Sequence, residues 1–156
     1  MTSAPSAAVS DTASSRTDAA NTSAAPVKEA LSEFADTMTA TLQSLLPQTD
    51  GPESRLFDAM RYSALGTGKF LRPYILRTAA LMFDVPEKHY LRAGAAVEMV
   101  HAYSLIHDDL PAMDDDDMRR GRPSCHIAFD EATAILAGDA LLTLSFEVLA
   151  GADTHP

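Results

Sequence analysis

The sequence predicts an all-α fold, a bundle of helices. Apolar residues recur every three or four positions through most of the chain, and the strict alternation of apolar and polar residues that marks a strand is absent. Segments rich in proline and glycine separate the periodic stretches. The chain has 156 residues, of which 46% are hydrophobic, which is enough for the core of one domain. No internal repeat is present.

The first 26 residues differ from the rest in composition. They are rich in Ala, Ser and Thr and hold scarcely any large apolar side chain, so we expect residues 1–26 to form a disordered tail and residues 27–156 to form one helical domain. Arg16 is the tail's only basic residue, and no apolar stretch is present, which argues against a transit or signal peptide.

The domain is expected to contain five helices in order. A stripe of apolar residues predicts the first helix, from Val27 to about Leu46. Its members are Leu31, Phe34, Met38, Leu42 and Leu45. Prolines, glycines or acidic residues bound the later helices, which we expect over about residues 53–65, 71–83, 88–107 and 131–150.

The acidic run before the last helix says most about function. It places six aspartates beside two arginines: Asp108, Asp109, Asp114, Asp115, Asp116, Asp117, Arg119 and Arg120. Carboxylates packed this densely repel one another unless a cation or water screens them, and arginines suit phosphate oxygens. Mg²⁺ bridging carboxylates and phosphates would satisfy both groups. A solvated acidic loop stays open on composition alone, but an EF-hand does not fit, because Met118 and Arg119 stand where acidic residues or glycine belong.

The same stretch, HAYSLIHDDLPAMDDDDMRRG, resembles the first aspartate-rich motif of the trans-isoprenyl diphosphate synthases, and most closely that of bacterial farnesyl diphosphate synthases. The resemblance continues upstream through LGTGKFLRP and downstream through GRPSCHIAFDEATAILAGDALL, so it covers about residues 55–150. It implies an isoprenoid-synthase-like helical bundle, truncated to its first helices, which is the N-terminal half of that fold.

The resemblance also implies a reaction. An allylic diphosphate, dimethylallyl or geranyl, would lose its diphosphate, and isopentenyl diphosphate would attack the resulting cation. Mg²⁺ would be the cofactor, and Asp108, Asp109 and Asp114 would be the catalytic metal ligands, since negative charge develops on the departing diphosphate. Arg119 would hold the allylic diphosphate.

A second set of residues would bind isopentenyl diphosphate. The resemblance assigns this role to Lys69, Arg72, His101 and Arg120. Lys69 and Arg72 lie at a predicted helix start, where free N–H groups attract anions, although such residues are more often solvated surface. The family's pattern there is Gly-Gly-Lys-Arg-x-Arg-Pro, from which this chain departs with Thr67 and Phe70. Glu98 is three residues before His101 and so shares its helix face.

Product length should depend on what blocks the growing chain. Tyr103, with Ser104 beside it, lies five residues before Asp108, which is about 7.5 Å along a helix. From the residues alone, Tyr103 is equally a core aromatic. The resemblance favours Tyr103 and Ser104 as chain-length residues and a fifteen-carbon product, farnesyl diphosphate; geranyl and geranylgeranyl diphosphate stay open.

Charge and cysteine content limit the partners and the compartment. The formal net charge of −10 argues against a nucleic-acid partner, which needs a broad basic surface. Cys125 is the only cysteine, which fits a reducing compartment, and we expect the cytoplasm. We predict no membrane span, because no uninterrupted apolar run is long enough. Cys125 and His126 are too isolated for a metal pair and are expected to be structural. The resemblance implies a homodimer.

The chain contains no second aspartate-rich motif, which the family carries on later helices. The sequence is therefore expected to be the N-terminal part of a longer synthase, a subunit that pairs with another chain, or an inactive remnant. A noncatalytic module that binds Mg²⁺ or diphosphate is the alternative to a prenyltransferase.

Overall fold

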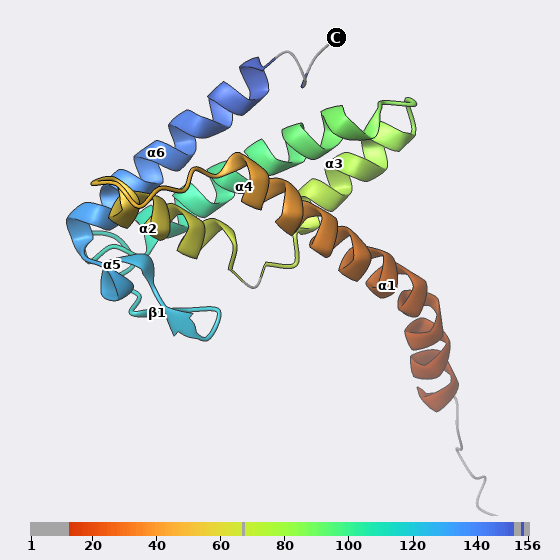
Figure 1. Cartoon of the computed structure of the whole chain (residues 1–156). Coiled ribbons are helices and arrows are strands. Elements are labelled where there is room, and N and C mark those ends of the chain that lie inside the picture. The colour runs from red at the N-terminus through yellow and green to blue at the C-terminus, as the bar shows by residue number, and fades with distance from the viewer. Residues whose placement is uncertain (1–12, 67, 152–153, 155–156) are drawn as a thin grey trace, which may run out of the picture. The chain divides into compact units, whose positions relative to one another are not determined.

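A computed structural model describes residues 13–66, 68–151 and 154, and among these the secondary structure is almost entirely helical (Figure 1). The helices are α1 (Ala13–Leu45), α2 (Ser54–Ala64), α3 (Leu71–Leu81), α4 (Glu87–Asp108), α5 (Cys125–Ala128) and α6 (Glu131–Ala150). Two short strands, β1 (Met118–Arg119) and β2 (Arg122–Pro123), complete the described structure. The five helices expected from the periodicity are all present, and the all-α class is confirmed.

The beginning of α1 differs from expectation. The chain divides into two compact units, residues 1–30 and residues 31–156. In the first unit α1 begins at Ala13, whereas we expected a disordered tail over residues 1–26. Alanine has the highest helix propensity of all residues, and this segment is rich in it, which favours a helix there. The part of the expected tail over residues 1–12 lies outside the described residues.

In the second unit, α1 contributes one apolar face to the core. Phe34, Met38 and Leu42 are buried at the spacing that a helix face requires, and Leu46 continues the row. Phe34 also meets Tyr74 of α3 edge to face, with the ring centroids 5.7 Å apart. The predicted stripe therefore faces the core, which ties this part of α1 to α3.

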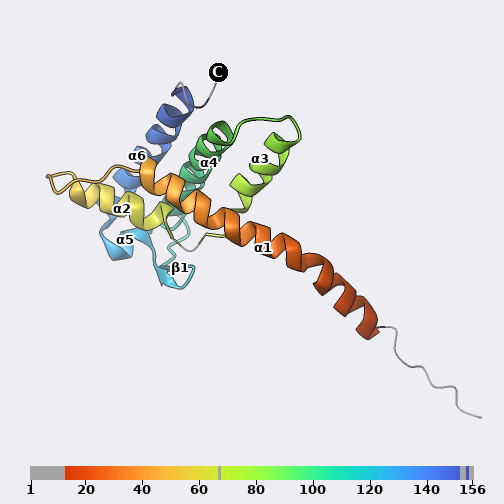
Figure 2. The same ribbon diagram turned by 45° about the vertical axis from the view of Figure 1, so that its right-hand side comes forward.

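Helix α4 lies between α3 and α6 (Figures 1 and 2) and is the centre of the second unit. Small residues allow the helices to approach closely on both sides. A Cβ added at Gly94 would lie 3.1 Å from the Met38 side chain and 3.2 Å from Pro73 of α3. On the other side, Gly138 of α6 lies against the ring of His107. These contacts fix α4 in place, and with it the residues at its C-terminal end.

Helix α6 is long and apolar enough, by length and composition, to cross a membrane. We predicted no membrane span because no uninterrupted apolar run is long enough. Helix α6 instead reaches the hydropathy of a membrane-spanning helix although polar residues are scattered through it. Core helices of soluble proteins meet the same criterion. Here α6 packs against α4 and α2, and it buries Ala134, Ala137, Gly138 and Leu141 among others.

The start of α6 is held by Asp130. Its Oδ1 accepts a hydrogen bond from the Thr133 backbone N at 2.7 Å, its Oδ2 accepts one from the Thr133 hydroxyl, and Arg55 of α2 pairs with the same carboxylate at 2.6 Å. The Arg55 hydrogen bond, followed by those from Thr133, lowers the pKa of Asp130 to about 2.

We expect Asp130→Ala to lower the melting temperature at pH 7 by removing the helix cap. Because the folded-state pKa lies below the unfolded value of about 3.9, the stabilisation by the charged form is present above pH 4 and is lost as the pH falls through about 2. Thermal melts of wild type and variant at pH 7 and pH 2.5 measure this. Asp130→Asn, which keeps an acceptor, should lose less; a difference that does not narrow at low pH would contradict the prediction.

The strands β1 and β2 form an antiparallel hairpin, with Arg119 opposite Arg122. Its turn is Arg120–Gly121, and both residues have left-handed backbone angles, with φ of 53° and 78°. Two successive positive φ values are typical of the two-residue turns that match the twist of a hairpin. The sequence analysis did not predict these strands, because two-residue strands are too short to show alternation.

Candidate functional site

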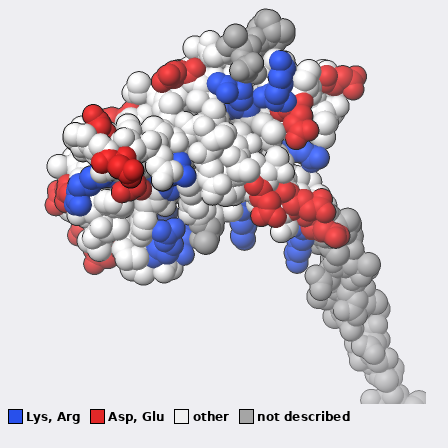
Figure 3. Space-filling view, viewed as in Figure 1, with Lys and Arg blue, Asp and Glu red and all other residues white. Residues whose placement is uncertain are grey.

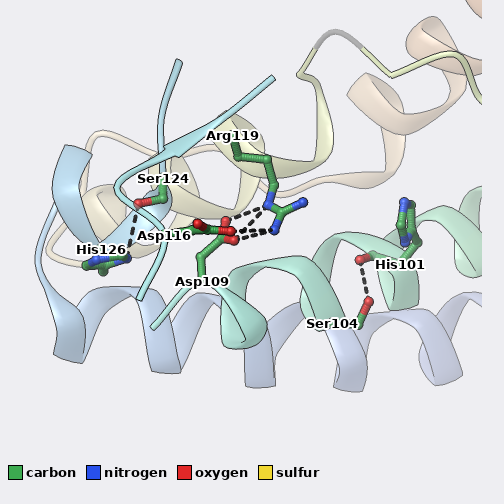
Figure 4. A network of polar contacts seen from close by, with 7 residues as sticks. All are labelled: His101, Ser104, Asp109, Asp116, Arg119, Ser124 and His126. Carbon is green, nitrogen blue, oxygen red and sulfur yellow. Dashed lines mark hydrogen bonds and ion pairs between the residues drawn. The ribbon is translucent and has the colours of Figure 1, made fainter. Parts of the chain in front are cut away.

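The C-terminal end of α4 carries the first candidate residues, and the hairpin folds back over it (Figure 4). Asp109 is 2% exposed. Its carboxylate accepts hydrogen bonds from Nε of Arg119 at 2.8 and 2.7 Å and a further one from Nη2. The hydrogen bond with Asp109 is the largest effect that raises the pKa of Arg119. The structure thus joins Asp109, a predicted metal ligand, to Arg119, a predicted substrate ligand.

The other aspartates lie at the last residue of α4, Asp108, and in the exposed loop that follows it. The backbone N of Asp114 donates to the carbonyl oxygen of Asp108 at 2.8 Å, so the loop returns to the helix end. Asp108 and Asp114 are exposed, as are the three aspartates that follow. Asp115 turns the chain with φ of 55°. The structure brings Asp108 and Asp114 together through their backbones and leaves both carboxylates open to solvent.

The donor chemistry of this loop fits Mg²⁺, although among the described residues no group of three or more His, Cys, Asp and Glu side chains converges to hold a metal by itself. Mg²⁺ prefers oxygen ligands and is usually bound by one or two carboxylates, with waters and substrate phosphates as its other ligands. Asp108 and Asp114 could supply two such carboxylates. Asp109 already has both oxygens bonded to Arg119.

A second group of candidates surrounds a pocket of about 230 Å³, which we call the cationic pocket. Its lining residues are Lys69, Phe70, Leu71, Arg72, Glu98, His101 and Arg120. They come from the segment before α3, from α3, from the middle of α4 and from the hairpin turn. All four residues predicted to bind isopentenyl diphosphate therefore meet here, although they are up to 51 positions apart in the sequence.

The backbone at the start of α3 is unusual. Phe70, the residue before the first turn, is buried and has a φ of 45°. A bulky residue with positive φ is rare, and such strain persists only where the surroundings impose it. Lys69 and Arg72 flank this residue and are exposed. The free N–H groups of the first turn of α3 lie at the same pocket, which favours an anion.

Two titratable groups on one face of α4 line the cationic pocket. Burial is the largest effect that lowers the pKa of His101, followed by the nearby Arg72, Arg120 and Arg119, so its imidazole is neutral near pH 7. Burial also raises the pKa of Glu98, against the opposite influence of Arg120 and Arg72. In Figure 4 His101 projects from the same side of α4 as Asp109, about two turns away.

The two predicted chain-length residues lie in different surroundings. Ser104 lines a groove of about 400 Å³ between α4 and α6, together with Val100, Ser145 and Phe146. Its hydroxyl donates to the carbonyl oxygen of His101 at 2.9 Å. Tyr103 is partly buried against the core and meets the ring of His107 edge to face, with centroids 4.8 Å apart. Tyr103 is not among the described residues that line the groove between α4 and α6.

Cys125 and His126 begin the short helix α5 and are buried. His126 Nδ1 lies 3.1 Å from the hydroxyl of Ser124 (Figure 4). Burial raises the pKa of the Cys125 thiol, which disfavours a reactive thiolate. We interpret both residues as structural.

Two residues at this site were not predicted from the sequence: Glu98, which lines the cationic pocket, and Gly68, which lies beside it. A Cβ added at Gly68 would lie 3.0 Å from Nη1 of Arg120 and 3.5 Å from Oε1 of Glu98. The spacing of Glu98 and His101 placed the two on one helix face, but nothing in the sequence showed that this glutamate is buried.

Comparison with known proteins identifies the family of the chain. Residues 53–155 match the polyprenyl synthetase family model. The chain is 54% identical over 105 residues to a farnesyl diphosphate synthase of Haemophilus influenzae, covering 65% of this chain and 36% of the relative. It is 58% identical over 96 residues to a farnesyl diphosphate synthase of Escherichia coli, covering 62% of this chain and 32% of the relative. The chain thus spans about a third of the length of these relatives.

A solved structure shares the fold. The crystal structure of an FPP/GFPP synthase from Zymomonas mobilis superposes with a TM-score of 0.82 and 45% identity, over 85% of this chain and 48% of the other. The matched family model covers the α2–α6 region, which contains the acidic loop and the cationic pocket. The chain therefore belongs to the polyprenyl synthetase family.

Proposed function

We propose that this chain provides the Mg²⁺-binding and diphosphate-binding residues of a prenyltransferase that joins isopentenyl diphosphate to an allylic diphosphate. One observation carries the proposal: the exposed Asp108 at the end of α4 follows His101 of the cationic pocket by seven residues, or about two turns, so the two residues share one side of the helix. Two diphosphate substrates must be held at once and in a fixed orientation, which requires two anion sites. The relatives named farnesyl diphosphate synthase support this class of reaction.

In this reaction the allylic C–O bond breaks and the diphosphate leaves with the electron pair. The double bond of isopentenyl diphosphate attacks the allylic cation, a carbon–carbon bond forms and one proton leaves. Mg²⁺, when bound, would neutralise the charge that develops on the departing diphosphate. Asp108 and Asp114 would hold the metal, with Asp109 orienting Arg119. Nη1 of Arg119, which has no hydrogen-bond partner among the described residues, would contact the allylic diphosphate.

The cationic pocket would hold isopentenyl diphosphate. Lys69, Arg72 and Arg120 would supply positive charge for its phosphate oxygens. Because His101 is neutral near pH 7, it would donate a hydrogen bond and add no further charge. Orienting the attacking substrate in this way lowers the entropic part of the barrier.

A product assay tests the proposal. The purified 156-residue chain is incubated with Mg²⁺, labelled isopentenyl diphosphate and dimethylallyl or geranyl diphosphate, and the carbon number of any labelled product is measured. A fifteen-carbon product, farnesyl diphosphate, is expected. Mg²⁺-dependent diphosphate binding without condensation would favour the noncatalytic module. Neither binding nor product in a folded sample would overturn the proposal.

The proposal includes Tyr103 as the residue that limits product length. Its ring lies on α4 about one and a half turns before Asp108, where it would block a chain that grows along the helix. We expect Tyr103→Ala to shift the product from fifteen to twenty or more carbons in the same assay. Tyr103→Phe, which keeps the ring, should not. An unaltered product from Tyr103→Ala would reject this role.

We also propose a cytoplasmic homodimer. A lone buried cysteine suits a reducing compartment.

Large apolar side chains on α6 are exposed to solvent in the single chain, namely Ile135, Leu136, Phe146 and Leu149. A surface of this kind is a candidate for burial against another protein chain. On the face shown in Figure 3, Lys and Arg are interspersed with Asp and Glu. Light scattering on the purified chain measures the mass; a monomer would contradict the homodimer.

A further inference from the structure

Glu98 is the one carboxylate among the residues that line the cationic pocket, and it is 5% exposed. A glutamate is rarely buried unless it is paired. No hydrogen bond or ion pair within 4.0 Å joins Glu98 to another described residue, and none of its oxygens is both enclosed and unpartnered. The carboxylate therefore opens into the pocket among the cations. Its burial is costly, so it needs a compensating interaction.

Of the cations at this pocket, Arg120 is the one whose orientation most depends on a neighbouring residue. It is exposed, it lies at the tip of a two-residue turn, and its own backbone is left-handed. It also lies near Arg72, and two guanidinium groups at one pocket repel each other. Arg120 is nevertheless directed inward, since a Cβ added at Gly68 would lie 3.0 Å from its Nη1 and 3.5 Å from Oε1 of Glu98, so both groups lie beside this glycine.

We propose that Glu98 is a positioning residue whose buried carboxylate attracts the guanidinium of Arg120 into the cationic pocket and keeps it directed at the diphosphate. Gly68 makes this possible, because any side chain there would meet Nη1 of Arg120. The inference rests on the proposed function, since it assumes that the pocket holds a diphosphate.

The Glu98 carboxylate also repels a diphosphate. Its net effect on binding therefore depends on whether this repulsion or the positioning of Arg120 is larger. Without Glu98, Arg120 must be ordered from solvent when the ligand binds, against repulsion from Arg72, and ordering a long side chain is a substantial cost of binding. The repulsion is limited, because the guanidinium groups of Arg72 and Arg120 lie at the same pocket and offset the charge of the carboxylate. Positioning should therefore outweigh repulsion.

The test is the affinity for isopentenyl diphosphate in metal-free buffer, measured by calorimetry, so that Mg²⁺-dependent binding at the aspartates does not contribute. We expect Glu98→Gln, which removes the charge and keeps the shape, to raise the dissociation constant about fivefold to tenfold. In an Arg120→Gln background the same change should have less than a twofold effect. Glu87→Gln removes one charge from the exposed start of α4 and is the matched control, expected to bind like wild type.

A second variant keeps the test decisive if Glu98→Gln does not fold, which a thermal melt shows. Gly68→Ala leaves the buried carboxylate in place and displaces only the end of Arg120. It should weaken binding in the wild-type background and not in Arg120→Gln. Unchanged or tighter binding by Glu98→Gln, or an equal loss in both backgrounds, would overturn the inference. If Gly68→Ala does not weaken binding in the wild-type background, the inference is also overturned.

The proposed function fails in a different way. If the wild-type chain does not bind isopentenyl diphosphate, or if Arg120→Gln binds as well as wild type, the assignment of the pocket is wrong and the inference falls with it. If Arg120→Gln weakens binding and Glu98→Gln does not, only the inference is wrong.

Discussion

Replacing Asp108 or Asp114 with alanine is expected to abolish most Mg²⁺-dependent turnover while leaving the helical content unchanged. Each replacement removes a carboxylate that would hold the metal, and metal stabilisation of a developing charge amounts to several kcal/mol. Since about 1.4 kcal/mol is a tenfold change in rate, we expect a loss on the order of a hundredfold to a thousandfold. Both side chains are exposed, so neither contributes much to the core.

Asp109→Ala should differ from these two variants. Asp109 is buried and its carboxylate accepts three hydrogen bonds from Arg119, so its removal leaves a partly buried guanidinium without its partner. We expect the free energy of unfolding to fall by about 2–3 kcal/mol, in addition to any loss of activity. Asp109→Asn, which keeps one acceptor, should lose less.

Product formation and urea unfolding on the three variants separate the roles. Unchanged turnover in both Asp108→Ala and Asp114→Ala would refute the metal assignment. Equal stability of Asp109→Ala and wild type would show that the Asp109–Arg119 pair does not hold the hairpin. Asp117→Ala serves as the control for lost negative charge, because Asp117 is an exposed aspartate of the same run to which we assign no role in the site.

Gly138→Ala is expected to destabilise the protein by about 1–2 kcal/mol. An added Cβ would come within 2.6 Å of Cδ2 of His107 and closer still to Nε2, distances that real Cβ atoms essentially never show. Inserting a methyl group into a packed contact typically costs about 1–3 kcal/mol, and the higher helix propensity of alanine offsets up to about 1 kcal/mol of this. Gly138→Val, with two further methyl groups, should cost more. Urea unfolding measures both variants.

The double variant His107→Ala, Gly138→Ala tests the cause. Without the imidazole the clash is absent, while the gain in helix propensity remains. In the His107→Ala background we therefore expect Gly138→Ala to be neutral or stabilising. If the destabilisation persists there, a neighbour other than His107 limits the space at Gly138.

Helical periodicity was sufficient to predict most of the fold. The second helix was expected over about residues 53–65 and runs from Ser54 to Ala64, and the fifth was expected over residues 131–150 and occupies this range. The apolar face of a helix repeats over many residues, so a long periodic segment can be recognised as a helix from the sequence. The hairpin and α5 were missed because elements of two to four residues are too short to show a period, and because the hairpin depends on left-handed angles at Arg120 and Gly121.

The residue types of the site could also be read from the sequence. The aspartate run and the arginines after it indicated a metal and phosphate ligands, and the resemblance added Lys69, Arg72 and His101. The partnerships among them could not be read. Asp109 and Glu98 are charged residues, which are exposed by default. The packing of the hairpin against α4 buries Asp109, and the hairpin together with the start of α3 surrounds Glu98 with cations.

The sequence by itself therefore determined the all-α class, the order of the helices and the chemistry available at the end of α4, since these follow from local periodicity and residue type. The tertiary structure alone decided that Arg119 pairs with the buried Asp109 and that the buried Glu98 lies at the same pocket as Arg120. These partnerships depend on the left-handed turn of a short hairpin and on contacts between residues far apart in the chain. Local sequence patterns do not encode such contacts.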